Sequence, residues 1–287
     1  MAFMTTKESV QTCVLSKRWK ELWKSLPTLT LSNTHFRKNS LFKKFIHKVL
    51  LHRDNSSALR NFSIEHKGFV HCRIFGNLIA YAVSHDVEQF KFEAGICCYA
   101  RNVVFVNSLC PCYTLKYLNL SFRGTKGAII FPETLDLPEL IDCRLKDIAF
   151  CSSDSGCAKP FLGCNKLSTL VIDNCTIYDA EICCMFSDKL FNLTVWYNRL
   201  TYDPDKQRST PNLSSFAFVG RLITSNSNHQ PFEYNLGLLE DANVEDFCWE
   251  ISLDIAETLK SWLNRFGTVS SSRHCSQTSK VLCSSFW

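Results

Sequence analysis

A six-residue frame recurs along the middle of the chain and constrains its fold more than any other feature. Each copy has apolar residues at its first, fourth and sixth positions, and successive copies start 28, 28, 25, 27, 23 and 23 residues apart. The copies are Leu59/Phe62/Ile64, Val87/Phe90/Phe92, Leu115/Leu118/Leu120, Leu140/Cys143/Leu145, Leu167/Leu170/Ile172, Leu190/Leu193/Val195 and Leu213/Phe216/Phe218.

These steps lie within or close to the range of about 20 to 29 residues that is typical of leucine-rich repeats. In such a unit, a short strand points alternate residues into a shared core, and no unit can bury its apolar face alone, so neighbours stack. Two copies extend the pattern to a ninth position, Cys175 and Asn198, where we expect an inward side chain that satisfies backbone groups as the strand turns away.

The expected fold class is therefore α/β, with an irregular leucine-rich-repeat solenoid, or horseshoe, as its main part. Its exposed strand face and loops would bind a protein or an extended ligand. An ordinary β-sheet protein with leucine-rich strands is the alternative. Residues 232–247 are expected to form an eighth strand and a short helix, after a loop at residues 224–230.

Helical patterns precede the repeats. Thr5 and Glu8 predict a capping box at the start of one helix. Ser16 is the expected cap of a second helix, which Pro27 ends. A third helix is expected over residues 40–53, with Ser40 as its cap. The apolar stripe of the second helix is Leu15, Trp19, Leu22, Trp23 and Leu26, and that of the third is Leu41, Phe42, Phe45, Ile46, Val49 and Leu50.

Charge is concentrated at the N-terminal end. Residues 1–53 hold eleven Lys and Arg against two Glu, whereas the remainder holds 21 against 25 acidic residues. Sixteen cysteines, in a chain whose first twenty residues lack the uninterrupted apolar region of a signal peptide, are expected to be reduced. No apolar run approaches the roughly 18 residues of a spanning helix. These features favour a location in the cytosol, the nucleus or both.

Other functional classes fit the sequence less well. It has no nucleophile elbow, phosphate-binding glycine loop or metalloprotease His pair, so we expect no enzyme active site and no cofactor. No cysteine pair has C-x₂-C spacing, and small buried apolar residues at repeat positions, such as Cys143 and Cys175, explain the cysteines better than zinc does. The basic segment could bind nucleic acid or a membrane surface, but its tryptophans recur with leucines at helical spacing, so neither partner is expected.

The segment TKESVQTCVLSKRWKELWKSLPTLTL, and above all VLSKRW followed by LW, resembles the second half of an F-box as it occurs in the plant F-box/leucine-rich-repeat proteins of the FBD type. The resemblance covers roughly residues 3–250. It implies a non-enzymatic substrate adaptor, whose F-box docks onto the adaptor subunit of an SCF-type (cullin-RING) E3 ubiquitin ligase and whose repeats bind an unknown protein substrate. The partner-binding positions that it implies are Val10, Val14, Leu15, Ser16, Arg18 and Trp19.

The same resemblance predicts the organisation of the chain: a partial F-box at residues 1–31, a linker and capping helix at 32–57, repeats at 58–250, and a C-terminal helix with an irregular tail at 251–287. In the family a further helix with a Leu-Pro pair opens the F-box, and it has no counterpart before Thr5. Docking is then expected to be weaker or lost, which leaves open a repeat-based binding module that no longer recruits the ligase. We hypothesise that a truncated or alternatively spliced gene model accounts for both ends.

Overall fold

The structure, a computed structural model, describes the chain in eleven segments. These are residues 5–16, 19–97, 106–109, 112–123, 129–151, 157–178, 182–183, 189–196, 213–220, 240–246 and 271–274. The ninth-position residue Asn198, the loop expected at 224–230 and all of the predicted C-terminal helix and tail at 251–287 except residues 271–274 lie outside them.

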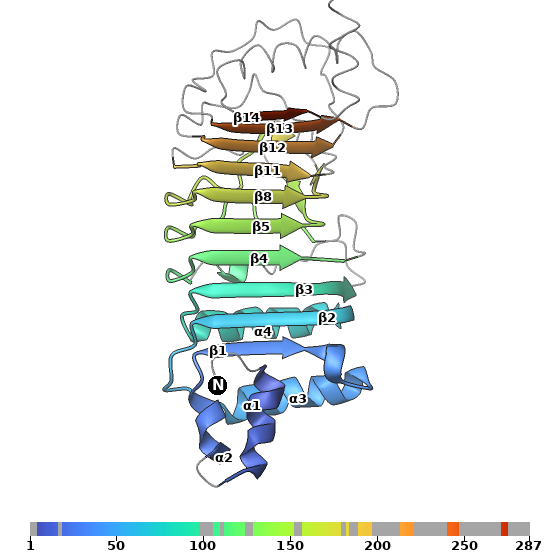
Figure 1. The fold of residues 1–287 in the computed structure, drawn as a ribbon, viewed down its shortest axis with the longest axis vertical. Coiled ribbons are helices and arrows are strands. Elements are labelled where there is room, and N and C mark those ends of the chain that lie inside the picture. The colour runs from blue at the N-terminus through green and yellow to red at the C-terminus, as the bar shows by residue number, and fades with distance from the viewer. Residues whose placement is uncertain are drawn as a thin grey trace, which may run out of the picture.

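One ten-stranded sheet runs through the molecule, and its strands follow each other in chain order (Figure 1). Every pairing in it is parallel. This arrangement confirms the α/β class. The strands are β1 (Thr28–Ser32), β2 (Asn61–His71), β3 (Gln89–Cys97), β4 (Tyr117–Ser121), β5 (Asp142–Lys146), β8 (Thr169–Asp173), β11 (Asn192–Trp196), β12 (Ser215–Gly220), β13 (Asp241–Asp246) and β14 (Ser271–His274).

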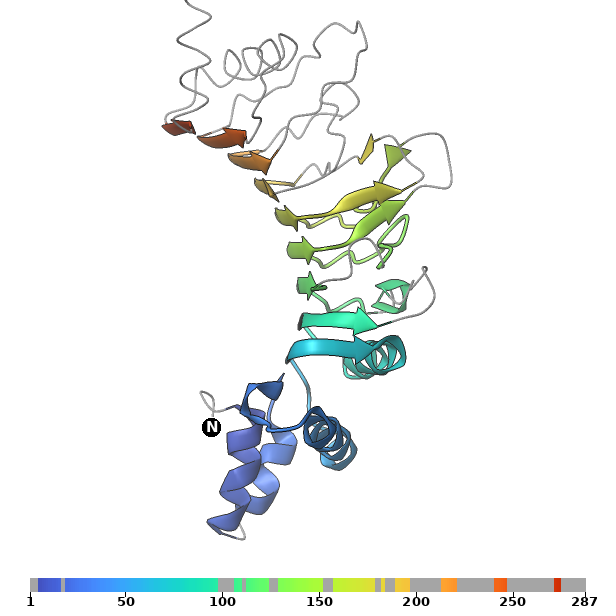
Figure 2. The ribbon, with the colours of Figure 1, turned by 90° about the vertical axis from the view of Figure 1, so that its right-hand side faces the viewer.

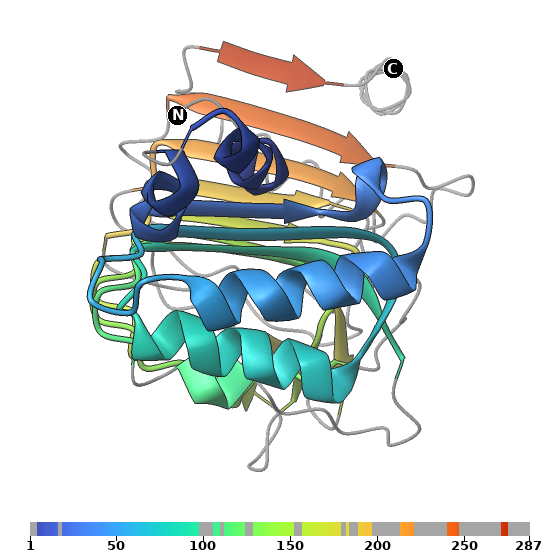
Figure 3. The same cartoon turned by 90° about the horizontal axis from the view of Figure 1, so that it is seen from below.

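Helices and short strands form a second layer. Figures 2 and 3 show α3 (Asn39–His52) and α4 (Cys72–Ser84) on one face of the sheet, and α1 (Thr6–Gln11) and α2 (Trp19–Leu22) on the other side of β1. The remaining elements are η1 (Thr12–Val14), η2 (Trp23–Ser25), η3 (Asn33–His35) and η4 (Val106–Leu109), with the parallel pairs β6 (Ala149–Cys151) with β9 (Thr176–Tyr178) and β7 (Cys157–Ala158) with β10 (Ile182–Cys183).

The repeated frame forms the core, as the sequence predicted. In the first six copies all three apolar residues are buried, and in the seventh Leu213 is buried. Equivalent residues are register partners across the sheet: Phe62 pairs with Phe90, Phe90 with Leu118, and Leu118 with Cys143. Because alternate residues of a strand point to opposite faces, the same register places the intervening polar residues on the uncovered face.

The turn after each of two strands uses a left-handed residue. Asp147 follows β5 with φ 58° and Asn174 follows β8 with φ 50°, and the amide of Asn174 donates to the carboxylate of Asp147. Asp and Asn tolerate this conformation better than most residues. Cys175 is buried as expected, and its thiol donates to the carbonyl of Asp173 at 3.5 Å. The repeats therefore hydrogen-bond to each other at the ends of their strands as well as along them.

The expected helices form, with two corrections. The Thr5–Glu8 capping box is present, and the Ser16 hydroxyl accepts from the Trp19 amide at 3.4 Å. Ser40 does not cap α3, because the helix begins one residue earlier at Asn39, with Lys38 at the cap position and no side-chain hydrogen bond. Leu41 points away from the core and is half exposed, since it lies at the edge of the apolar stripe of α3.

Helix α4 was not expected from the sequence. Its buried residues Phe75, Leu78, Ile79 and Ala82 recur at three- and four-residue steps. The ring of Phe75 lies 4.4 Å from that of Phe92 of β3, so α4 covers the second and third strands as α3 covers the first two. Residues 232–247 were predicted to form an eighth strand followed by a short helix. Residues 232–239 lie outside the described part, and residues Asp241–Asp246, at the end of this range, form the strand β13 and not the expected helix.

Arg53 links the helical end of the molecule to the sheet. It is only 3% exposed, and its guanidinium donates to the carbonyls of Leu26 and Ala58 at 3.1 and 3.0 Å. Its own amide caps α3 by donating to Val49 at 3.0 Å. One side chain therefore joins the segment before β1 to the segment before β2.

We expect Arg53→Ala to lower the free energy of unfolding by about 2–4 kcal/mol, because it leaves two carbonyls without their donor and removes a buried side chain. Urea titration followed by tryptophan fluorescence measures the change. Arg60→Ala is the matched control: this guanidinium is exposed and 3.9 Å from Glu88, so its removal should change stability by less than about 0.5 kcal/mol. Equal losses in the two variants would contradict the linking role of Arg53.

Burial makes the thiols of Cys143 and Cys175 unreactive in the folded protein. Burial raises the pKa of the Cys143 thiol well above its usual range and that of Cys175 to about 12. The thiolate is the reactive form, so a pKa about three units above the usual value makes it on the order of a thousandfold scarcer at neutral pH. In the folded protein, a maleimide at pH 7.5 should label the exposed Cys97 while leaving Cys143 and Cys175 unlabelled. Mass spectrometry with and without urea checks this, and labelling of Cys143 at the rate of Cys97 would contradict it.

Candidate interaction surfaces

An apolar surface is exposed on the N-terminal helices. Val14 and Leu15 are 88% and 68% exposed, and Trp19 and Leu22 are also exposed. We call these four residues the apolar tip. Val14 and Leu15 end the first helical segment, and Trp19 and Leu22 lie in α2, which follows it. Figure 2 shows α1 and α2 beyond β1, at the end of the molecule. Four large apolar side chains in one short segment mark a protein-interaction surface more than isolated exposed residues do.

The rest of the helical pair is fixed to the sheet. The Thr6 hydroxyl of α1 accepts from the Thr30 amide of β1 at 2.8 Å, and Trp23 is buried in the core. The thiol of Cys13 lies 3.6 Å from the Lys20 carbonyl and connects the two helical segments. At the start of α1, the backbone and side chain of Thr5 donate to Glu8 and lower the pKa of its carboxyl. The apolar tip therefore stands on an anchored base.

The six predicted partner-binding residues take different positions. Val14, Leu15, Ser16 and Trp19 are exposed and Val10 is half-buried, packing against the core. Arg18 lies outside the described residues. Leu22 was predicted as part of the apolar stripe but not as a partner-binding residue, although the structure exposes it in the apolar tip. The sequence feature that could have indicated this role is its position one turn after Trp19 on the same helix.

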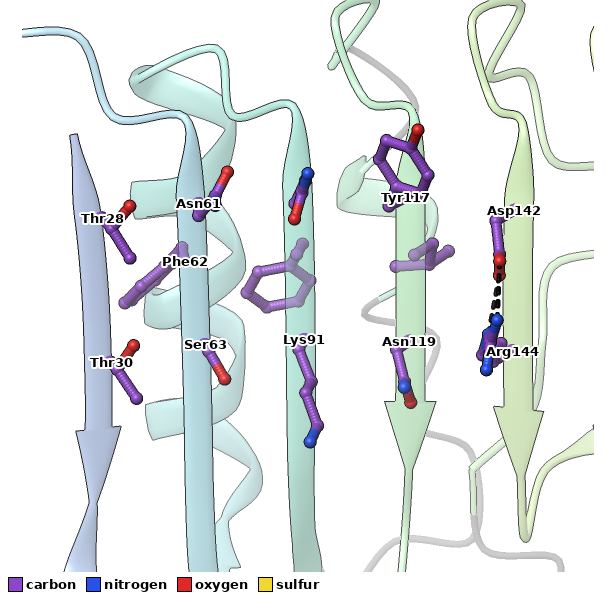
Figure 4. A pocket seen from close by; sticks show the side chains of 13 residues that line it. Thr28, Thr30, Asn61, Phe62, Ser63, Lys91, Tyr117, Asn119, Asp142 and Arg144 are labelled. Carbon is purple, nitrogen blue, oxygen red and sulfur yellow. Dashed lines mark hydrogen bonds and ion pairs between the residues drawn. The ribbon is translucent and has the colours of Figure 1, made fainter. Parts of the chain in front are cut away.

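The uncovered face of the sheet carries a second candidate surface. A groove of about 510 Å³ crosses β1 to β5 on this face (Figure 4). Its register is continuous, because Asn61, Gln89, Tyr117 and Asp142 are successive partners in neighbouring strands. The lining residues are Thr28, Thr30, Asn61, Phe62, Ser63, Gln89, Phe90, Lys91, Tyr117, Leu118, Asn119, Asp142 and Arg144.

The charges of this groove are largely paired within the protein. Arg144 donates from Nε and Nη2 to the two carboxylate oxygens of Asp142, both at 2.9 Å, and this contact raises the pKa of the guanidinium. Lys91 lies 3.6 Å from Glu93. A paired, balanced groove can hydrogen-bond to a polypeptide through amides and hydroxyls without demanding a charged ligand.

Further ion pairs lie on the same face beyond the groove. Arg123 pairs with Glu93, and Lys146 pairs with Asp173 of the next strand. The hydrogen bond to Asp173 raises the pKa of the Lys146 ammonium. Trp196, at the end of β11, is exposed. The uncovered face is therefore polar with a few aromatic side chains, a composition found in protein-binding surfaces.

Two other kinds of site, a metal centre and a membrane-spanning helix, are absent from the described segments. Among these residues, no three His, Cys, Asp or Glu side chains are placed to hold a metal ion. Of the helices that can be described, none is both long and apolar enough to cross a bilayer.

Comparison with known proteins identifies relatives in Arabidopsis thaliana. A putative F-box/FBD/LRR-repeat protein is 29% identical over 173 residues, which are 59% of this chain and 38% of the relative. An FBD-associated F-box protein is 32% identical over 42% of this chain and 27% of its own length. An F-box/LRR-repeat protein is 26% identical over 76% of this chain and 58% of its own length.

No protein-family model and no solved structure matches the chain. The chain spans less than half the length of the first relatives, 38%, 27% and 42% of them. These relatives are 26% to 33% identical to the chain, and all of their names carry the F-box that the sequence predicted. Several of the names also carry the leucine-rich repeat. The chain is therefore similar to plant F-box proteins, several of which also carry leucine-rich repeats.

Proposed function

We propose that this protein is a non-enzymatic substrate adaptor of an SCF-type cullin-RING ubiquitin ligase. The apolar tip docks onto the adaptor subunit of the ligase, and the uncovered face of the sheet binds a protein substrate. The observation that carries the proposal is the exposure of Val14, Leu15 and Trp19, since these belong to the VLSKRW segment that resembles the F-box.

The proposal includes a leucine-rich-repeat solenoid as the substrate-binding part. Its support is the order of the strands, their parallel pairing and the burial of the first six copies of the frame. Each strand of the ten-stranded sheet pairs only with its neighbours in that sheet, and these neighbours follow chain order, which is the arrangement of a stacked repeat array. Such an array offers a long surface to a protein substrate.

Ubiquitin transfer by this route needs no catalytic residue in the chain. An adaptor that holds a substrate beside a ubiquitin-charged enzyme converts a bimolecular encounter into a local one, so the effective concentration of the substrate rises. The proposed role calls for the cytosol, the nucleus or both, where free thiols such as those of the buried cysteines stay reduced.

The apolar tip supplies a direct test of ligase recruitment. We expect the full chain to co-purify with a plant SCF adaptor subunit, and Leu15→Asp to reduce the recovered complex at least tenfold. The reason is that a carboxylate placed in the centre of an apolar contact must be desolvated without a partner. Leu15 is 68% exposed, so the substitution should leave the melting temperature unchanged.

Leu162→Asp is the matched control. Leu162 is 57% exposed in the repeats, far along the chain from the tip, and its substitution should leave recovery unchanged. If Leu15→Asp and Leu162→Asp recover equal amounts of the adaptor subunit, the adaptor does not bind at the apolar tip. If the unaltered chain recovers no adaptor subunit, ligase recruitment is wrong and a repeat-based binding module remains.

A further inference from the structure

The outward face of α3 and the turn before it carries unbalanced positive charge. Arg37, Lys38, Lys43, Lys44 and Lys48 are all exposed. Between Glu21 and Asp54 the sequence contains no acidic residue, and within the described segments none of the five cations forms an ion pair. We call these five residues the basic face.

These charges do not stabilise the helix that carries them. Lys44 and Lys48 are one turn apart, where like charges repel. Lys38 is at the N-cap and no acidic residue lies in the first turn, although the dipole of a helix favours negative charge there. The stability of α3 comes from Phe42, Ile46 and Val49, which are buried on its inner side. The basic face lowers local stability and has no partner among the described residues. Binding to an external partner of opposite charge therefore explains it better than a role in stabilising α3.

The chemistry of the surface favours a protein partner over lipid or nucleic acid. Leu41 and Leu51, near the two ends of α3, are 50% and 67% exposed beside the lysines. Protein interfaces combine apolar and charged groups in this way. A lipid-binding helix would insert an apolar stripe, but the stripe of α3 is already buried against the sheet. Its aromatic residues Phe42 and Phe45 point toward the core, so they offer no platform on which bases could stack.

The C-terminal end of α3 contacts the segment that follows the helices of the apolar tip. The Asp54 amide, just after α3, donates to the Lys24 carbonyl of η2 at 3.1 Å, and Arg53 donates to Leu26 beside it. Figures 2 and 3 show α1, α2 and α3 at the same end of the molecule, on either side of β1. A protein that docks on this end therefore faces both surfaces.

We propose that the partner of the apolar tip contacts α3 as well, through an acidic surface that is complementary to the basic face. This inference rests on the proposed docking to the adaptor subunit and names the second half of that interface. The apolar tip supplies most of the binding energy, and the basic face orients the partner and speeds association. The electrostatic part should weaken with salt, because the Debye length falls from about 30 Å at 0.01 M to about 8 Å at 0.15 M ionic strength.

Charge reversal on the full-length chain tests the inference. We compare Lys44→Glu/Lys48→Glu with Lys159→Glu/Lys166→Glu, two exposed lysines of the repeats, by titration calorimetry against the purified adaptor subunit at 0.02 M and 0.5 M salt. Both variants change the net charge equally. We expect the α3 variant to bind about tenfold more weakly at low salt, to differ little at high salt, and to melt as the parent does.

Three other outcomes would contradict the inference, each for a different reason. Equal affinity of the two variants, with the parent still binding, would overturn the basic face as part of the interface and leave the apolar tip intact. No binding by the parent would overturn the proposed function and this inference together. Binding of the parent to phosphatidylserine vesicles, lost in the α3 variant, with unchanged adaptor affinity, would assign the basic face to lipid.

Discussion

The mutual burial of the repeated apolar triads holds the protein together. A single strand with three inward side chains leaves those side chains open on both flanks until a strand before it and a strand after it close them. The register pairs Phe62, Phe90, Leu118 and Cys143 in one continuous row, so each unit supplies part of its neighbour's core. This dependence determines the parallel order of the strands, the single long sheet and the need for a cover at its first edge.

The cover at the first edge explains the N-terminal elements. α3 packs Phe42, Ile46 and Val49 into the same core as the first strands, and the buried Arg53 joins carbonyls of two segments that flank β1 and β2. Because the inward residues of the N-terminal elements cover the edge of the sheet, only their outward residues can contact a partner. These outward residues form the apolar tip and the basic face, the two surfaces that contribute least to the stability of the fold.

The repeats were predictable from the sequence because the period of a strand is two and leaves no ambiguity about which residues face inward. The burial or exposure of single residues in the helices was harder to predict. Trp19, Leu22 and Trp23 share one helical stripe in the sequence, yet only Trp23 is buried, because α2 is a single turn and only part of the stripe reaches the sheet. Helix α4 was missed although its apolar spacing is regular, since the strand frames on either side of it dominated the pattern. The groove could not be foreseen, because it depends on the register of five strands.

The two candidate surfaces differ in the way a two-partner adaptor requires. The uncovered face of the sheet holds its charges in internal pairs such as Asp142 with Arg144, so a ligand there competes with existing hydrogen bonds and is selected by shape and by amide and hydroxyl contacts. The N-terminal end has exposed apolar groups and, on α3 and just before it, cations that form no ion pair with any residue that the structure describes. Such a combination favours rapid and strong attachment to one complementary partner. Under the proposed function, a constant partner at the end and a selected partner on the sheet contact different residues, so both can bind at once although the groove begins at β1, beside the docking helices.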